Sequence, residues 1–274
     1  MNKFMTIGLA AVFAAGFANA QDGNLMVNQG GGNDIADAEA SVELALVSAQ
    51  VWRGQVQNED FVLQPQFTVA QYGVSFNVWA NYSFSKNYLD VENDLSEVDL
   101  SLAYTLPLDL NDVSFTIGAI NYQFPANGPT TLNGLGTNSK STTELFAAAY
   151  WLTFKEFVIP SATYYGDIGE IDGSYILFDI VAPYEVSDVL KVEVGFATGW
   201  GDARYNSGYW GTSDKGFNDY NFYGNASYEI MENLTASVNL TYTGLYGGQI
   251  EDAGGQRYEA KEKFWGGVNI AYDF

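Results

Sequence analysis

The chain has 274 residues, in which 33 aspartate and glutamate residues face only 11 lysine and arginine residues. Its formal net charge of -22 argues against nucleic acid as a partner, because an acidic surface repels a phosphate backbone. The sequence contains neither cysteine nor histidine, which excludes cysteine nucleophiles and hydrolases that need histidine as a base. Asp167, Glu170 and Asp172 could supply a catalytic carboxylate pair, but their spacing does not differ from that of an ordinary acidic loop. We therefore expect no enzyme and no cofactor.

The first twenty residues are typical of a cleaved secretory signal. Lys3 precedes an apolar run from Met5 to Phe17, and the small residues Ala18 and Ala20 mark the predicted cleavage site. A membrane anchor is the weaker alternative, because the run is shorter than a bilayer requires. Residues 21–40 are glycine-rich and acidic, and we interpret them as a flexible lead-in.

From Ser41 to the end, apolar and polar residues alternate with the period of a half-buried strand. In LTASVNLTYTG, from Leu234 to Gly244, the residues between the apolar ones are threonine, serine or asparagine. Prolines in three segments indicate strand starts, edges or bulges. The twelve predicted strands are 41–52, 61–70, 74–84, 98–106, 113–122, 143–153, 157–166, 174–184, 190–200, 220–230, 234–243 and 264–274.

The connections between these segments alternate strictly between short turns and long polar loops. This order is typical of an outer-membrane barrel, with short periplasmic turns and long extracellular loops. A strand protein crosses a bilayer only as a closed barrel, because lipid leaves no backbone group a partner. Residues 41–274 are therefore predicted to form a closed antiparallel transmembrane β-barrel of about twelve strands. A soluble exported β-sandwich or lectin-like domain is the alternative.

The last segment, WGGVNIAYDF, stays apolar on one face to its final residue. Phe264, Ile270, Tyr272 and Phe274 lie on this face. The last strand is predicted to pair with the first, with Phe274 facing lipid, and the pattern resembles the C-terminal signal read by the bacterial barrel-assembly machinery. Aromatic residues predicted to lie near the strand ends, as in interfacial belts, are Trp52, Tyr82, Trp151, Tyr164, Tyr184, Trp200, Tyr220, Tyr228, Tyr242 and Tyr272.

A barrel of twelve strands should enclose a narrow passage. The side chains predicted by parity to line it include Asn77, Trp79, Asn81, Asp99, Glu144, Asp179, Lys191, Glu193, Asn221 and Glu229. With Glu43 added, the carboxylates outnumber the one lysine by six to one, which favours cations. Alternatively, some acids lie at strand ends in bulk water and have no effect. Three inward aromatic residues, Trp79, Tyr223 and Trp265, would form either a sugar-stacking track or buried filler.

Two of the long loops carry specific hypotheses. The loop from Pro125 to Ser141 is a candidate constriction on account of its length, and truncating it should raise conductance. Asp90, Glu92 and Asp94 alternate as in the start of an EF-hand, but Leu95 stands where a turning glycine is required. We therefore expect no metal site there, and at most a weak divalent bridge to lipopolysaccharide phosphates.

The segment from Val47 to Phe67 resembles the start of the TorF-type family of small outer-membrane porins. The matching residues are Trp52, Arg53, Gly54, Gln57, Leu63 and Gln64, whereas Gln50 and Val56 depart from the pattern. The resemblance implies a bacterial outer-membrane barrel of the porin type, and it supplies no catalytic residues. By its position, Arg53 is predicted either to guard a pore mouth or to pair with Glu59 or Asp60.

We predict a passive channel for small cations or neutral solutes in the bacterial outer membrane. The alternatives are a non-conducting barrel with a structural or surface-interaction role, and a soluble β-sandwich that binds a ligand. The expected partners are outer-membrane lipid, lipopolysaccharide, the barrel-assembly machinery and small solutes, and the sequence leaves open whether barrels form a homo-oligomer.

Overall fold

Twelve antiparallel strands form one closed barrel. The computed structural model describes residues 38–274 except 88, 109, 111 and 126–140, so the predicted signal, with its cleavage residues Ala18 and Ala20, and nearly all of the lead-in lie outside the described residues. Around the ring the order is β1, β14, β13, β12, β11, β10, β9, β8, β7, β6, β5, β4. The wall strands are β1 Glu39–Val47, β4 Val62–Gln71, β5 Val74–Ser83, β6 Asp94–Thr105, β7 Val113–Gln123, β8 Ser141–Trp151, β9 Ile159–Asp167, β10 Ser174–Ser187, β11 Leu190–Gly201, β12 Gly216–Met231, β13 Leu234–Leu245 and β14 Glu262–Asp273.

The barrel closes between its first and last strands. Val42 in β1 lies opposite Tyr272 in β14 on one side and opposite Phe67 in β4 on the other. Phe274 continues the pairing, since its N–H donates to the carbonyl of Ala40 at 2.8 Å, and its residue surface is 72% exposed. The prediction of a closed antiparallel barrel of twelve strands is confirmed, and the sandwich alternative is excluded.

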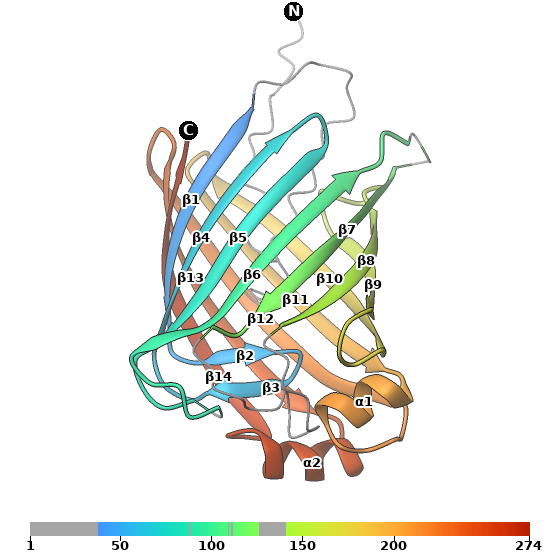
Figure 1. Ribbon diagram of the computed structural model, residues 1–274. Coiled ribbons are helices and arrows are strands. Elements are labelled where there is room, and N and C mark those ends of the chain that lie inside the picture. Colours follow the sequence, from blue (N-terminus) through green and yellow to red (C-terminus); the bar gives the residue numbers. More distant parts are fainter. Residues whose placement is uncertain (1–37, 88, 109, 111, 126–140) are drawn as a thin grey trace, which may run out of the picture.

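The two ends of the barrel differ, as Figure 1 shows. At the turn end, where Phe274 and the start of β1 lie, neighbouring strands are joined by short turns. Tyr72 and Gly73 connect β4 to β5 with φ angles of 54° and 79°, as a type I′ turn requires. The long loops that the structure describes lie at the opposite end, which we call the loop end.

The wall has an apolar outer face and a polar inner face. In β12, Phe222 is 55% exposed, whereas its neighbours Asn221 and Tyr223 are 3% and 6% exposed. The same alternation leaves apolar side chains exposed on the outside, among them Val42, Leu44, Leu102, Leu145, Phe178, Val194, Val238, Leu240, Val268 and Ile270. Such an exterior is suited to lipid, because no soluble monomer leaves so much apolar surface in water.

Aromatic side chains are exposed near both ends of the wall. Trp151, Tyr184 and Tyr228 are exposed near the turn end, and Tyr164 is exposed near the loop end. Trp52 is an exception to the predicted belt, because it is buried inside the barrel. The predicted strand 41–52 was therefore wrong in its last part, since the wall strand β1 ends at Val47.

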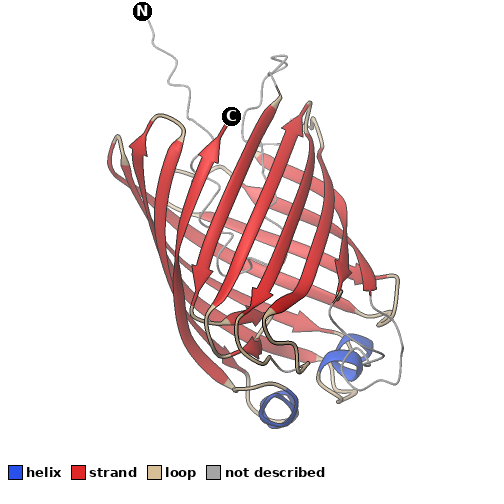
Figure 2. Ribbon diagram, turned by 60° about the vertical axis from the view of Figure 1, so that its left-hand side comes forward, coloured by secondary structure: helices blue, strands red, loops and turns tan. Residues whose placement is uncertain are grey.

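Two short helices cover the loop end, α1 Ala203–Tyr209 before β12 and α2 Gln249–Arg257 before β14. Figure 2 shows both helices at this end of the barrel, outside the cylinder of wall strands. Among the described residues, no helix has the length and apolarity needed to cross a membrane. Neither helix was predicted, because both are single short elements inside polar loops.

An arginine placed on the outer wall tests whether lipid covers this face. Leu240 lies in the middle of β13 and is 53% exposed. We expect Leu240→Arg to lower the free energy of unfolding by about 2–4 kcal/mol, the cost of arginine near a bilayer midplane. Urea unfolding of the barrel inserted in lipid vesicles measures this change. Glu232→Arg, in the exposed turn before β13, is the control, and an equal loss in both variants would contradict a lipid-facing wall.

Candidate functional site

The first long loop folds into the barrel as a hairpin. Strands β2 Gln50–Trp52 and β3 Gln55–Asn58 form a two-stranded sheet that is separate from the wall. Arg53 and Gly54 form its tip, with φ angles of 45° and 82°. Every residue from Gln50 to Asn58 is buried, and Figure 1 shows the hairpin lying crosswise to the wall strands at the loop end.

The base of the hairpin is fixed to the strand and loop on one side of the barrel. The N–H of Ser48 donates to the carbonyl of Gly266 in β14 at 2.9 Å. In the loop before β14, the N–H of Glu259 donates to the carbonyl of Val56 at 3.1 Å. The Glu259 carboxylate in turn accepts the N–H of Glu59 at 2.8 Å. These backbone contacts set the direction in which the hairpin enters the barrel.

The first strand of the hairpin also contacts the opposite flank of the wall. The Gln50 side-chain amide donates to Glu97 in β6 and accepts from Asn81 in β5, each at 2.9 Å. Asn81 also donates to Ser96 at 2.8 Å. This amide network uses polar residues on the inner faces of β5 and β6, so the hairpin is held from both sides.

The hairpin tip reaches the far wall of the barrel. The strands that flank the hairpin, β1 and β4, are neighbours in the ring, and β9 and β10 lie opposite them. Arg53 forms a two-pronged ion pair with Glu144 in β8, at 2.9 Å from Nη1 to Oε1 and 2.7 Å from Nη2 to Oε2. The arginine side chain is 0% exposed and the glutamate side chain 1% exposed. The hairpin therefore spans the lumen and narrows it.

Aromatic rings surround the Arg53 guanidinium. Its carbon lies 4.1 Å from the ring centre of Tyr165, 4.6 Å from those of Trp52 and Tyr175, and 5.9 Å from that of Tyr205. These distances fall within the range of cation–π attraction, which strengthens when the cation is desolvated. We call the surrounding groups the Arg53 cage: Trp52, Tyr165, Tyr175, Tyr205 and Glu144.

The cage is held by contacts of its own. The Tyr122 hydroxyl donates to Glu144 Oε2 at 2.9 Å, and the Tyr175 hydroxyl donates to Asp219 at 2.8 Å. Burial raises the pKa of the Tyr205 phenol well above its ordinary value, so this ring stays neutral beside the cation. These contacts fix the positions of the carboxylate and of two rings.

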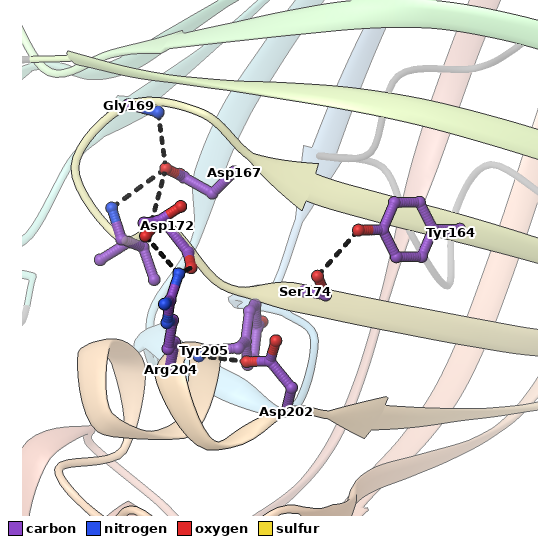
Figure 3. Close-up of polar contacts among 9 residues, drawn as sticks. Tyr164, Asp167, Gly169, Asp172, Ser174, Asp202, Arg204 and Tyr205 are labelled. Atoms are coloured by element: carbon purple, nitrogen blue, oxygen red, sulfur yellow. Dashed lines mark hydrogen bonds and ion pairs between the residues drawn. The ribbon is translucent and has the colours of Figure 1, made fainter.

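Figure 3 shows the polar contacts of α1, which carries Tyr205, and of the loop between β9 and β10. The Asp202 carboxylate accepts the N–H of Tyr205 at 2.8 Å and begins α1. Asp167 Oδ1 accepts the N–H groups of Gly169 and Ile171, and its Oδ2 accepts the Thr142 hydroxyl at 2.6 Å. Asp167 therefore shapes the loop between β9 and β10, which leaves it unsuited to form a catalytic carboxylate pair.

An exposed ion pair links this loop to α1. Arg204 pairs with Asp172, and both side chains are largely exposed. The pair has the same charges as Arg53 and Glu144 but not their burial. It is therefore a natural comparison for the buried pair, since exposed ion pairs contribute little to stability.

The predicted pore-lining residues fall into three groups. Asp179 and Lys191 are half-buried, and Glu229 is exposed near the turn end of β12. The buried ones are Asn77, Trp79, Asn81, Asp99, Glu144, Glu193 and Asn221. In the part of the chain that the structure describes, Arg53 is the one buried cation. Six carboxylates of this part are buried: Glu97, Asp99, Glu144, Asp167, Glu193 and Asp219.

Two expectations about the loop end change with the structure. The prediction that Arg53 pairs with Glu59 or Asp60 was wrong, because its partner is Glu144, 91 positions away in the sequence. The predicted constriction from Pro125 to Ser141 lies almost entirely outside the described residues. The hairpin was missed, although a two-residue turn with glycine between QVW and QVQN is a hairpin signal.

The three inward aromatic residues are each engaged with protein groups. The indole N–H of Trp265 donates to Thr243 at 3.0 Å, and its ring packs against the hairpin residues Val51 and Val56. The Tyr223 hydroxyl donates to Asp179 at 2.8 Å. Trp79 is fully buried. These contacts favour packing roles over a sugar-stacking track.

Comparisons with known proteins reveal the fold but no close relative. No protein-family model matches the chain, and a search of curated proteins finds no match. Among solved structures, the KdgM porin in complex with disordered oligogalacturonate matches with a TM-score of 0.51 at 8% identity, over 86% of this chain and 99% of that chain. The NanC porin matches with a TM-score of 0.50 at 11% identity, over 85% of this chain and 98% of that chain. The fold is therefore that of outer-membrane porin barrels.

The close packing of the hairpin tip can be tested at Gly54. A Cβ atom here would lie 2.5 Å from Asp219 Cβ and 2.7 Å from Leu245 Cδ2, and the φ angle is positive. Gly73 occupies the same position in a similar turn, but the nearest atom to a Cβ there is the Thr105 carbonyl oxygen at 3.0 Å. We expect Gly73→Ala to lower the free energy of unfolding by about 1–2 kcal/mol through backbone strain. Gly54→Ala should cost roughly 1–3 kcal/mol more, because it also overpacks the tip.

Urea unfolding of the two variants measures this difference. An equal loss in both would mean that the hairpin tip does not pack against β12 and β13 as described.

Proposed function

We propose that the protein is a passive channel of the bacterial outer membrane for small cations and neutral solutes, with the β2–β3 hairpin as its constriction. The observation that carries the proposal is the contrast between the two faces of one closed wall. Outside, rows of exposed apolar side chains match a bilayer, and inside, the buried side chains are mostly polar or acidic. A polar interior behind an apolar outer band is the arrangement found in water-filled barrels of the porin type.

Hydrogen-bonding groups on the inner wall support an aqueous passage. Both side-chain amide atoms of Asn239, the Thr241 hydroxyl and the Asn269 carbonyl oxygen are buried without a protein partner. Buried polar groups of this kind are normally satisfied by water. These groups face inward on β13 and β14, between exposed apolar residues, so their need for hydrogen-bond partners supports a lumen that holds water.

The charge of the lumen supports a preference for cations. Six buried carboxylates face inward or line the loop end, while the single buried cation among the described residues, Arg53, is neutralised by Glu144. Fixed negative charge in a narrow passage raises the local cation concentration. The oligogalacturonate in the KdgM complex is an anionic sugar, and such a ligand would be repelled by the lining of this barrel.

Location and assembly belong to the same proposal. Lipid and lipopolysaccharide would surround the wall, and the assembly machinery would read Phe264, Ile270, Tyr272 and Phe274, which are all exposed on the outer face of the last strand. Homo-oligomer formation stays a prediction, as does membership of the TorF-type family. An absence of enzymatic activity is supported by the lack of histidine and cysteine.

The second candidate is a barrel that does not conduct and acts through its loop end. The observation that favours it is the hairpin itself, which spans the lumen and is buried throughout. In this case the long loops and the two helices would form a surface for interaction. Conductance separates the two candidates, since both require the same membrane-inserted barrel.

We expect single-channel conductance steps in a planar bilayer and a cation-selective reversal potential under a salt gradient. Glu193 and Asp179 lie on the inner wall, so the double variant Glu193→Gln/Asp179→Asn should shift the reversal potential toward zero. Glu156→Gln, in the exposed turn between β8 and β9, should leave it unchanged. An inserted barrel without steps would support the second candidate, and equal potentials in all three proteins would show that the lumen carboxylates do not select.

A further inference from the structure

The Arg53 cage has the chemistry of a guanidinium receptor. One carboxylate meets both prongs of the guanidinium, at 2.7 and 2.9 Å, while aromatic rings lie against the same group. A planar fork is required to engage both carboxylate oxygens and to stack on rings, and an ammonium ion has neither property. The cage is therefore selective by shape as well as by charge.

Most of the cage belongs to parts of the barrel other than the hairpin. Glu144, Tyr165 and Tyr175 come from three adjacent wall strands, and Tyr205 comes from α1. Tyr122 and Asp219, which contact Glu144 and Tyr175, also lie on wall strands. Only Trp52 shares the hairpin with Arg53. Four of the five cage groups therefore belong to parts of the barrel other than the hairpin.

The bound group, by contrast, is presented by the hairpin, which is not part of the hydrogen-bonded wall. The hairpin pairs only with itself as a sheet, its register shifts between Gln50 and Val51, and a two-stranded hairpin alone is marginally stable. At its tip, Arg53 pairs with Glu144 on the far wall, and the Trp52 ring contacts the rings of Tyr122 and Tyr209. Arg53 therefore resembles a tethered ligand in a receptor formed by the wall.

Without the Arg53 side chain, the remaining cage should strongly favour binding of another cation. Glu144 would remain a buried carboxylate that has lost its cationic partner, which is far more costly than the intact pair is beneficial. A small guanidinium solute offers the same donors and the same planar faces.

We propose that the Arg53 cage is a binding site for guanidinium-type organic cations, which Arg53 of the same chain occupies, so that such solutes compete with the hairpin tip. The binding itself does not depend on the proposed channel. Its effect on conductance does, because displacement of the tip widens the passage only if solutes pass through it.

The first experiment uses the Arg53→Ala barrel in detergent, and heat-modifiable migration checks that the barrel is folded. Guanidinium chloride at low millimolar concentration is added, and tetramethylammonium chloride at equal ionic strength is the control salt. We expect a saturable rise in the unfolding temperature with guanidinium only. The Arg53→Ala/Glu144→Gln double variant should lose this response, because the carboxylate that holds the fork is gone.

Arg204→Ala is the matched control, since it removes an exposed arginine from its carboxylate at the same end of the barrel. A guanidinium response of equal size in this variant, or none in Arg53→Ala beyond that of tetramethylammonium, overturns the proposal. If Arg53→Ala does not fold, Arg53→Lys replaces it. Its ammonium fills the cage poorly, so guanidinium should still raise the unfolding temperature, and no response there also overturns the proposal.

Conductance separates this proposal from the proposed function. With a conducting barrel, we expect larger steps in Arg53→Ala than in the unaltered protein, and guanidinium should enlarge the steps of the unaltered protein by displacing the tip. If guanidinium binds but the conductance steps stay unchanged, guanidinium does not compete with the hairpin tip at the constriction. Binding in a barrel that never conducts supports the cage and contradicts only the channel.

Discussion

The structure depends on the closure of its hydrogen-bonded ring between β1 and β14. A bilayer offers no partner to an open strand edge, so every backbone group of the wall must be satisfied by a neighbouring strand. Closure makes the last residues as important as the first, and the pairing continues from Ser41 opposite Asp273 to the N–H of Phe274. An even number of strands also brings the start of β1 and the end of β14 to the turn end, which leaves the opposite end available for long loops.

Closure also produces two environments from one sequence pattern. Because side chains alternate along a strand, each wall segment presents apolar residues to the outside and polar residues to the inside. Within β12 and β13, Phe222 and Leu240 face outward, while Asn221 and Asn239 are buried on the inner side. Some of the chain's many acidic residues lie on this inner face, since Glu193 and Asp219 are also buried at inward-facing positions. A sequence with near-balanced hydropathy thus forms a membrane wall with an acidic interior.

The wall strands could be predicted from the sequence, because they depend on a local alternation of residues. Features that depend on contacts between distant residues could not. All twelve wall strands were predicted, because an alternation such as that around Leu240 is a local property. The strand from residue 41 was extended too far for the same reason, since the sequence pattern continues into β2 after the chain has left the wall at the end of β1. No pattern links Arg53 to Glu144, because the pair becomes adjacent only when the hairpin crosses the lumen of a closed barrel. The two helices were missed as well, since each is too short to show a helical period.

The position of the Arg53–Glu144 pair indicates a role in specificity more than in stability. The free-energy cost of desolvating a buried ion pair offsets much of its electrostatic attraction, so an apolar contact of the same size would hold the hairpin as firmly. An apolar contact, however, would accept the tip in several orientations, whereas a two-pronged pair accepts one. The surrounding rings add to this selectivity, because the ring centres of Tyr165 and Tyr175 lie 4.1 and 4.6 Å from the guanidinium carbon, and a planar guanidinium can stack on aromatic rings. The hairpin is thereby held across the lumen in one defined position, which is the property that a constriction of fixed width requires.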